Sequence, residues 1–245
     1  MDAHKESFYP ETLFGGFSGQ DGTVAFYTRV NALLQPNLVV LDVGCGRGEH
    51  SEDDVEYRRR LRCLRGKVDR VIGVDPDITG AHNPTIDEFR LLVPAQPWPI
   101  ADRAVNLVVC DSVLEHLPEP AELFRESSRV LVPGGYLCIR TTNVMGYVGA
   151  MSKLLPNRSH AVLLSRIQGG RKGEDVFPTL YKCNTMRSIR REMSGHGFRS
   201  VVYSHTAEPS YLSFSKLAYA LGVAHQKFAP SFLRLTIFAF GQLLT

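Results

Sequence analysis

The chain has 245 residues, a hydrophobic fraction of 44% and a formal net charge of +3. This length is sufficient for one α/β domain with a sizeable core, and the charge is too small a bias to indicate nucleic-acid binding. No apolar run approaches the ~20 residues of a membrane-spanning helix, and the polar N-terminus has the character of neither a signal peptide nor a membrane span.

Five cysteines are scattered along the chain, and none forms a C-x-x-C pair. An odd, dispersed set of this kind predicts reduced cysteines in a cytoplasmic protein. It also argues against a zinc site, so we expect no metal.

Helical and strand patterns alternate along most of the chain. Residues 21–34 have the spacing of a helix that Pro36 ends. Strands are expected at 38–43, 70–75, 88–93, 105–110, 135–141 and 198–203. Further helices are expected near 50–65, at 119–130, at 184–195 and at 211–225. This alternation predicts one doubly wound α/β domain with a mostly parallel sheet.

Two segments depart from the alternation. Residues 142–183 are too long for an ordinary connection and predict a lid or binding loop. The apolar stretch 233–240 follows a region in which Glu208 is the last acidic residue. It fits either a buried antiparallel strand, which we favour, or an amphipathic segment at a membrane surface.

A glycine-rich turn follows the first expected strand, in the sequence VVLDVGCGRG of residues 39–48. Gly44 and Gly46 allow backbone conformations that a Cβ forbids and a close approach to a ligand. The spacing differs from the dinucleotide fingerprint G-x-G-x-x-G, because Glu49 stands where the third glycine would fall. The next strand-end acid, Asp75, also lies beyond the expected ~20 residues.

Three further motifs follow in order: WPIADRAVNLV at 98–108, VVCDSVLEHL at 108–117 and RVLVPGGYL at 129–137. Together with the glycine turn, they resemble the motifs of class I methyltransferases that depend on S-adenosylmethionine (SAM). The segments PNRSH and EDVFPTLYKCNT, from 156 and 174 onward, are similar to a bacterial type-11 branch of that family. That branch often accompanies genes for surface-polysaccharide or secondary-metabolite synthesis.

The resemblance implies a seven-stranded, Rossmann-like sheet. Within one domain, it divides the chain into four parts. These are an N-terminal helical extension (1–36), a SAM-binding core (37–141), an acceptor-side insertion (142–183) and the C-terminal part of the sheet (184–245).

The resemblance also implies a cofactor site at the ends of the first strands. Gly44 and Gly46 would line the methionine half of SAM, and Asp42 would contact its amine. Asp75, followed by Pro76, would accept the ribose hydroxyls, for which two carboxylate oxygens are suited.

Other cofactor positions are less well defined. Ala95 would lie beside the adenine, but Pro94 replaces the acidic residue that often precedes this position. Asp111 and Ser112, after the fourth expected strand, fit either a cofactor contact or simple turn chemistry.

Methylation of a hydroxyl benefits from a general base. His116 follows the fourth expected strand, and His160, Glu174 and Asp175 lie in the insertion. Each of these residues fits a structural role as well, so the base stays open.

We expect the chain to transfer the methyl group of SAM to a hydroxyl of a sugar, a glycan or lipid-linked intermediate, or a secondary metabolite. One alternative is an NAD(P)-dependent oxidoreductase, against which the glycine spacing argues. Another is a scaffold that binds SAM without catalysis, against which the intact set of Asp42, Gly44, Gly46 and Asp75 argues. A peripheral membrane contact, if made, is expected through the C-terminal region, and no nucleic-acid partner is expected.

Overall fold

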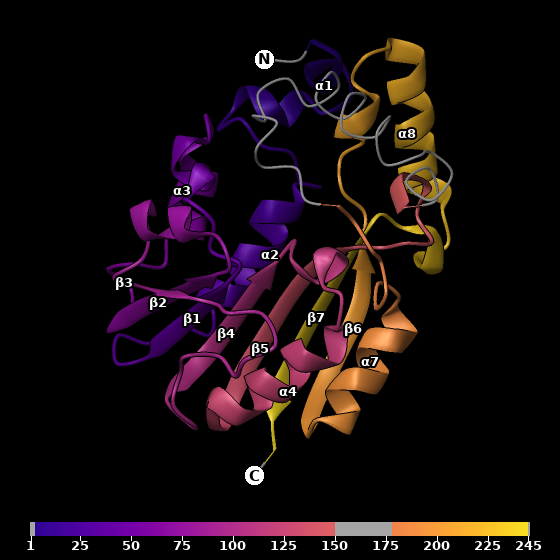
Figure 1. The fold of residues 1–245 in the computed structure, drawn as a ribbon. Helices are drawn as coiled ribbons and strands as arrows, with labels where there is room; N and C mark the ends of the chain where they lie inside the picture. The colour runs from indigo at the N-terminus through magenta and orange to yellow at the C-terminus, as the bar shows by residue number, and fades with distance from the viewer. Residues whose placement is uncertain (1–2, 150–177, 245) are drawn as a thin grey trace.

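The computed structural model describes residues 3–149 and 178–244. Most of the expected insertion therefore lies outside the described residues. Seven strands form one sheet in the order β3-β2-β1-β4-β5-β7-β6 (Figure 1). The strands are β1 (Val39–Val43), β2 (Arg70–Asp75), β3 (Glu88–Leu91), β4 (Val105–Asp111), β5 (Leu131–Thr142), β6 (Phe198–His205) and β7 (Thr236–Leu243).

Strands β1 to β5 are parallel to one another, whereas β7 lies antiparallel between β5 and β6. The seven-stranded, mostly parallel sheet expected from the sequence is thus confirmed. The apolar C-terminal stretch is β7, an inner strand in which Ile237 and Ala239 are fully buried. Burial on both faces explains why this strand is apolar without alternation.

The helices among the described residues are α1 (Ala3–Phe8), α2 (Gly22–Asn31), α3 (Glu56–Arg62), α4 (Pro120–Val130), α7 (Met186–Gly195) and α8 (Lys216–Phe228). None of these helices is long and apolar enough to cross a bilayer. Side-chain caps fix several starts: Asp21 accepts from the amides of Thr23 and Val24, and Thr185 forms a capping box with Ser188.

The helix expected near 50–65 is shorter than the sequence suggested. A 3₁₀ turn (Glu49–Glu52) comes first, and α3 begins only at Glu56. Asp53 separates the two, because its Oδ1 accepts from the amide of Val55 at 2.9 Å and its carboxylate pairs with Arg58. This local turn competes with helix formation.

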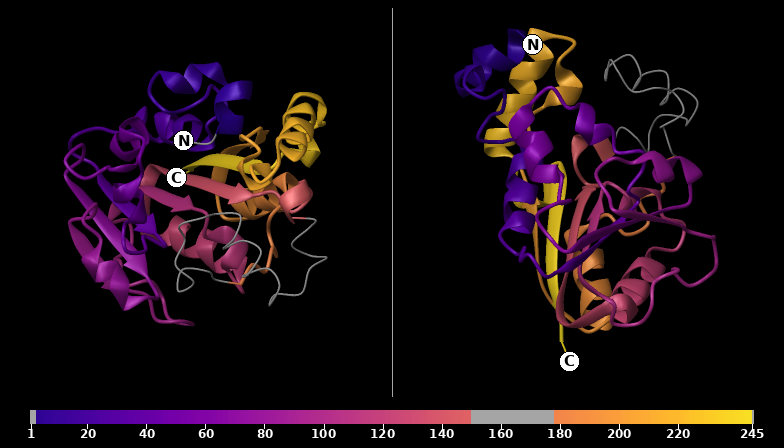
Figure 2. Two further views of the ribbon diagram at one scale, coloured as in Figure 1. Left: turned by 90° about the horizontal axis from the view of Figure 1, so that it is seen from above. Right: turned by 90° about the vertical axis from the view of Figure 1, so that its left-hand side faces the viewer.

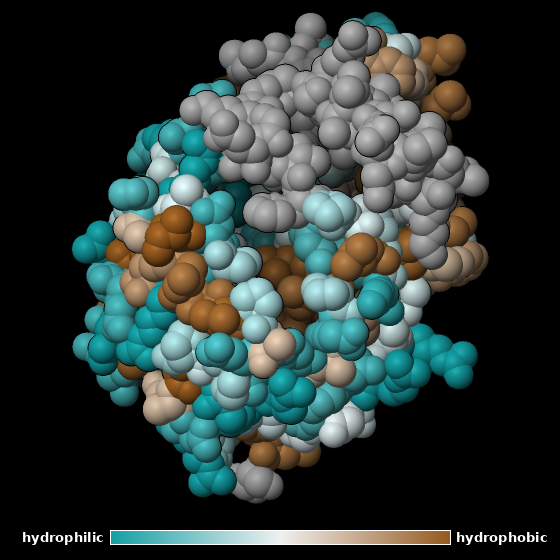
Figure 3. Space-filling view, viewed as in Figure 1, coloured by the Kyte–Doolittle hydropathy of each residue, from teal (hydrophilic) through white to brown (hydrophobic). Residues whose placement is uncertain are grey.

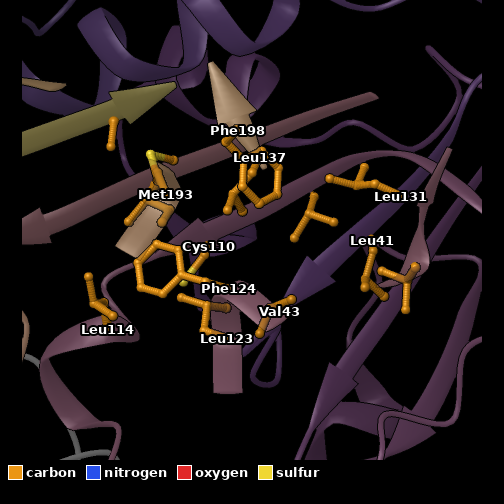
Figure 4. Close-up of a cluster of buried hydrophobic side chains, with 14 of the residues drawn as sticks. Leu41, Val43, Cys110, Leu114, Leu123, Phe124, Leu131, Leu137, Met193 and Phe198 are labelled. Atoms are coloured by element: carbon orange, nitrogen blue, oxygen red, sulfur yellow. The ribbon is translucent and has the colours of Figure 1, made fainter. Parts of the chain in front are cut away.

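Helices cover both faces of the sheet (Figure 2). On one face, Leu123 and Phe124 of α4 and Met193 of α7 pack against the strands in the larger core cluster (Figure 4). On the other face, Phe26 and Val30 of α2 pack against the same strands. The carboxyl ends of the parallel strands are left for a binding site, as is usual in doubly wound sheets.

Segments far apart in the sequence contribute to the region beyond this edge. Helices α1 and α8 lie there side by side (Figure 1). Tyr9 packs with Tyr219 and Val223 of α8, and its hydroxyl donates to the side chain of Gln226. The N-terminal extension therefore helps to build the surface above the strand ends.

Candidate active site

The glycine turn joins the end of β1 to the end of β2. The amides of Gly44 and Cys45 donate to the carbonyl of Val74 at 2.8 and 3.3 Å. Gly44 has a φ of +71°, and a Cβ there would lie 2.3 Å from Cγ2 of Val113. Only glycine fits this position, because both the conformation and the neighbouring side chain exclude a Cβ.

Asp75 is connected directly to this turn. It is 8% exposed, its Oδ2 accepts from the amide of Gly46 at 3.0 Å, and its Oδ1 accepts from the amide of Asp77 at 2.8 Å. Each carboxylate oxygen keeps capacity for a further hydrogen bond. Pro76, between the two, is exposed at the same strand end.

Asn83 stabilises the glycine turn by hydrogen bonds to its backbone, a role that the sequence analysis missed. Its Nδ2 donates to the carbonyls of Cys45 (2.8 Å) and Gly46 (3.2 Å), and it is 5% exposed. A Cβ on Gly48 would lie 2.4 Å from its Oδ1. The signal available in the sequence was only the Asn-Pro pair, which marks a turn and no more.

Asp42 lies one position before the end of β1. Burial, together with the nearby charge of Asp111, raises the pKa of its carboxyl to about 7. Among the described residues, its side chain has no hydrogen-bond partner in the structure. A ligand cation beside this carboxylate would compensate for the loss of solvent.

Asp111, at the end of β4, is held by three neighbours. Arg140 donates to its two oxygens at 2.5 and 2.6 Å, Tyr27 donates through its hydroxyl at 3.0 Å, and Arg62 lies 3.7 Å away. Burial favours protonation, but the charges of Arg140 and Arg62 outweigh it and lower the pKa of Asp111 to about 2. The carboxylate is thus ionised and joins the ends of β4 and β5 through its pair with Arg140. Its expected contact with the cofactor stays a prediction.

Two expected site residues have a backbone conformation that is unusual outside glycine. Ser112 follows Asp111 with a φ of +61°, and Ala95 has a φ of +62° in the exposed loop after β3. Residues in this region of conformational space are often found at functional sites. Ser112 faces the cavity described below, and the amide of Leu92, three residues before Ala95, donates to the carbonyl of Asp75.

The candidate bases are only partly described. His116 ends a 3₁₀ turn (Leu114–His116) after β4, and its Nδ1 lies 3.1 Å from the carbonyl oxygen of Pro178. His160, Glu174 and Asp175 lie outside the described residues. His116 thus lies just beyond the carboxyl end of β4, and its role as a base stays a prediction.

A cavity of about 480 Å³ opens at the same edge. Its walls come from α1, α2, the end of β5 and the segment before α8. Polar side chains among the lining residues include Asp21, Thr23, Ser112, Arg140, Thr142 and Ser210. The Nη1 of Arg140 donates to the Thr23 hydroxyl at 2.8 Å, which connects the end of β5 to the start of α2 across the cavity wall.

Comparison with known proteins identifies the family. A family model described as a methyltransferase domain matches residues 23–203, most of the chain. The chain belongs to this methyltransferase-domain family. The matched range of the methyltransferase domain includes the glycine turn, Asp75, Asp111 and His116.

Individual relatives agree with this assignment. A ubiquinone biosynthesis O-methyltransferase of Xanthomonas oryzae is 29% identical over 134 residues, which are 49% of this chain and 53% of the relative. The methyltransferase chain thus spans about half the length of the curated relatives it matches.

Two solved structures share the fold of this methyltransferase domain. Geranyl diphosphate C-methyltransferase of Streptomyces coelicolor has a TM-score of 0.56 at 15% identity, covering 90% of this chain and 76% of that one. The [4+2]-cyclase SpnF has a TM-score of 0.52 at 16% identity, covering 89% and 81%. Because a cyclase has this fold as well, the fold alone does not specify the reaction.

Proposed function

We propose that this protein transfers a methyl group from SAM to a hydroxyl of a sugar, a glycan intermediate or a secondary metabolite. The proposal rests on Asp75. Its buried carboxylate accepts a hydrogen bond from the amide of Gly46, at the edge of the sheet where the polar cavity opens. The family membership favours methyl transfer over the oxidoreductase alternative.

The residues at this edge fit SAM. Asp75 offers two carboxylate oxygens to a pair of ribose hydroxyls, and the space beside Gly46 is open, since nothing lies within 4 Å of a Cβ built there. Asp42 is a half-buried carboxylate whose pKa is raised by loss of solvent and by the charge of Asp111, and the amine of the methionine moiety would place a cation beside it.

The polar cavity supports a hydroxyl-bearing acceptor. Its lining hydroxyls and charged groups suit a ligand that makes many hydrogen bonds, and a volume of about 480 Å³ lies within the usual range for small-molecule sites. The O-methyltransferase activity named for the curated relative points the same way.

His116, which follows β4 at the carboxyl edge of the sheet, is the described candidate for the base that takes the acceptor proton, although it is not one of the residues that line the cavity. If its Nδ1–H donates to the Pro178 carbonyl, Nε2 is the basic nitrogen. SAM supplies the methyl group by in-line displacement, so the chain has to orient the acceptor oxygen and accept its proton. A cytoplasmic location is part of the proposal, supported by five free cysteines.

Titration calorimetry with S-adenosylhomocysteine, and with NAD⁺ in parallel, tests the cofactor. We expect micromolar binding of S-adenosylhomocysteine and none of NAD⁺. Incubation with labelled SAM and a panel of sugars, glycolipids and phenols then tests the acceptor. Binding of the cofactor without methyl transfer to any acceptor would support the scaffold alternative, and failure to bind S-adenosylhomocysteine would contradict the proposal.

A further inference from the structure

Helix α8 is apolar on two opposite faces. Its inner face packs on the N-terminal extension, where Tyr219 and Val223 lie against Tyr9. Its outer face carries Leu217, Leu221, Ala224 and Phe228, spaced by four, three and four residues, and we call these four residues the α8 stripe. This spacing places them in one line along the helix.

The α8 stripe is strongly exposed. Leu217 is 73% exposed, Leu221 63% and Phe228 84%. Phe214 before the helix and Phe232 after it are also exposed, at 66% and 52%. Hydrophobic colouring appears at the upper right of the space-filling view, over α8 (Figure 3). Clustered exposed apolar side chains of this size indicate a binding surface.

The charged side chains within the stripe's own segment have one sign. Lys216 and Lys227 of α8 are exposed. Residues 209–245 contain three basic residues, these two lysines and Arg234, and no acidic residue. The apolar surface is therefore flanked by cations that no acidic side chain of the same segment neutralises.

We propose that the α8 stripe docks on an anionic lipid surface. Leucine and phenylalanine side chains would enter the boundary between headgroups and acyl chains, while the lysines would contact lipid phosphates. The aliphatic stems of the lysines allow their charges to reach the headgroups at the level of the stripe.

A second copy of the chain fits the stripe less well. In a two-fold arrangement, identical surfaces meet, so Lys216 and Lys227 of both copies would come together. No acidic residue of 209–245 is available to pair with them. Charge complementarity thus favours lipid phosphates over another α8.

The position of α8 links this surface to the acceptor cavity. Tyr219, on the inner face of the helix, lines the cavity, as do Ser210 and Ser213 in the segment before it. Docking would hold the cavity beside the lipid surface. Resting on the proposed function, this inference assigns the acceptor to the class of polar headgroups carried on a lipid.

Vesicle sedimentation of the full chain is the test. We expect binding to vesicles with one third phosphatidylglycerol in phosphatidylcholine, and weak binding to phosphatidylcholine alone. The double variant Leu221→Gln/Phe228→Gln should bind about tenfold less or weaker still, since each buried apolar side chain contributes substantially. Lys216→Gln and Lys227→Gln should each weaken binding about fivefold at low salt.

Val201→Gln is the matched control. Val201 lies on β6 and is 65% exposed, close to the 63% of Leu221, but it is not part of the stripe. We expect this variant to bind vesicles like the original chain. Affinity for S-adenosylhomocysteine and the Tm should be unchanged in all variants, so that lipid docking and cofactor binding are tested separately.

Several results would overturn the inference. One is the absence of binding to the anionic vesicles, even with intact cofactor binding. Another is an equal loss in the Val201→Gln control. Analytical ultracentrifugation showing a dimer that the double variant dissociates would assign the stripe to a second copy, and a lowered Tm would assign it to the chain itself.

Discussion

Asp111 and Arg140 lie opposite each other on the neighbouring parallel strands β4 and β5 and form a bidentate ion pair. Their side chains are 6% and 14% exposed. A pair with this geometry and burial joins the two strand ends that border the cavity.

Asp111→Asn should lower the free energy of unfolding by about 3–5 kcal/mol, because it leaves the buried guanidinium of Arg140 without its counter-charge. Urea unfolding measures the change. Asp102→Asn is the control: Asp102 also pairs with an arginine, Arg129 at 2.6 Å, but its side chain is 74% exposed. That variant should lose no more than about 1 kcal/mol, and equal losses would contradict the structural role of the buried pair.

Asp75→Ala should weaken binding of S-adenosylhomocysteine by about 1–3 kcal/mol, the cost of losing charge-assisted hydrogen bonds to the ribose. Calorimetry on folded variant protein measures this. Asp77→Ala removes a carboxylate two residues away that caps a 3₁₀ turn on the surface, and it should bind normally. An unchanged affinity in Asp75→Ala would refute the ribose assignment.

Affinity for S-adenosylhomocysteine should fall with decreasing pH, because the pKa of Asp42 is about 7 in the ligand-free protein. A bound amine favours the ionised carboxylate, so below pH 7 binding must release a proton, and the affinity should fall by up to about tenfold per pH unit. Asp42→Asn should abolish this slope and Asp77→Asn should keep it. A slope that persists in Asp42→Asn would assign the titration to another group.

Gly48→Ala should destabilise the protein more than Gly66→Ala. Both glycines have a φ of +79°, so both variants carry a backbone cost of about 1–2 kcal/mol. At Gly66 a Cβ meets nothing within 4 Å, whereas at Gly48 it meets Asn83. Overpacking should add about 1–3 kcal/mol in Gly48→Ala, and cofactor affinity should fall because Asn83 supports the turn. Equal urea midpoints would show that Asn83 moves away at no cost.

Much of the fold was predictable because its signals are local. The strands alternate with helices, and the apolar C-terminal stretch is a strand. Asp75 is the last residue of β2 and contacts the glycine turn. The sequence placed α8 several residues too early, at 211–225, since it did not reveal that Ser215, whose Oγ accepts from the amide of Ala218, starts the helix.

The features that the sequence analysis missed depend on residues far apart in the chain. Arg140 belongs to the site only through its register with Asp111, and Asn83 reaches back 38 residues to Cys45. The packing of Tyr9 on α8 joins an N-terminal segment to a helix far along the sequence. Composition and periodicity record none of these pairings, because each depends on how elements are placed in three dimensions.

The order of strands also constrains synthesis. Among the described strands, β6 pairs with β7 alone, and β7 comes after all the others in the sequence. Until β7 is synthesised, β6 has no described partner strand, and the backbone edge of β5 that pairs with β7 is open. The nascent chain therefore passes through a stage in which β1 to β5 can pair while β6 is unpaired, and an unpaired strand edge is prone to aggregation and is a target for chaperones.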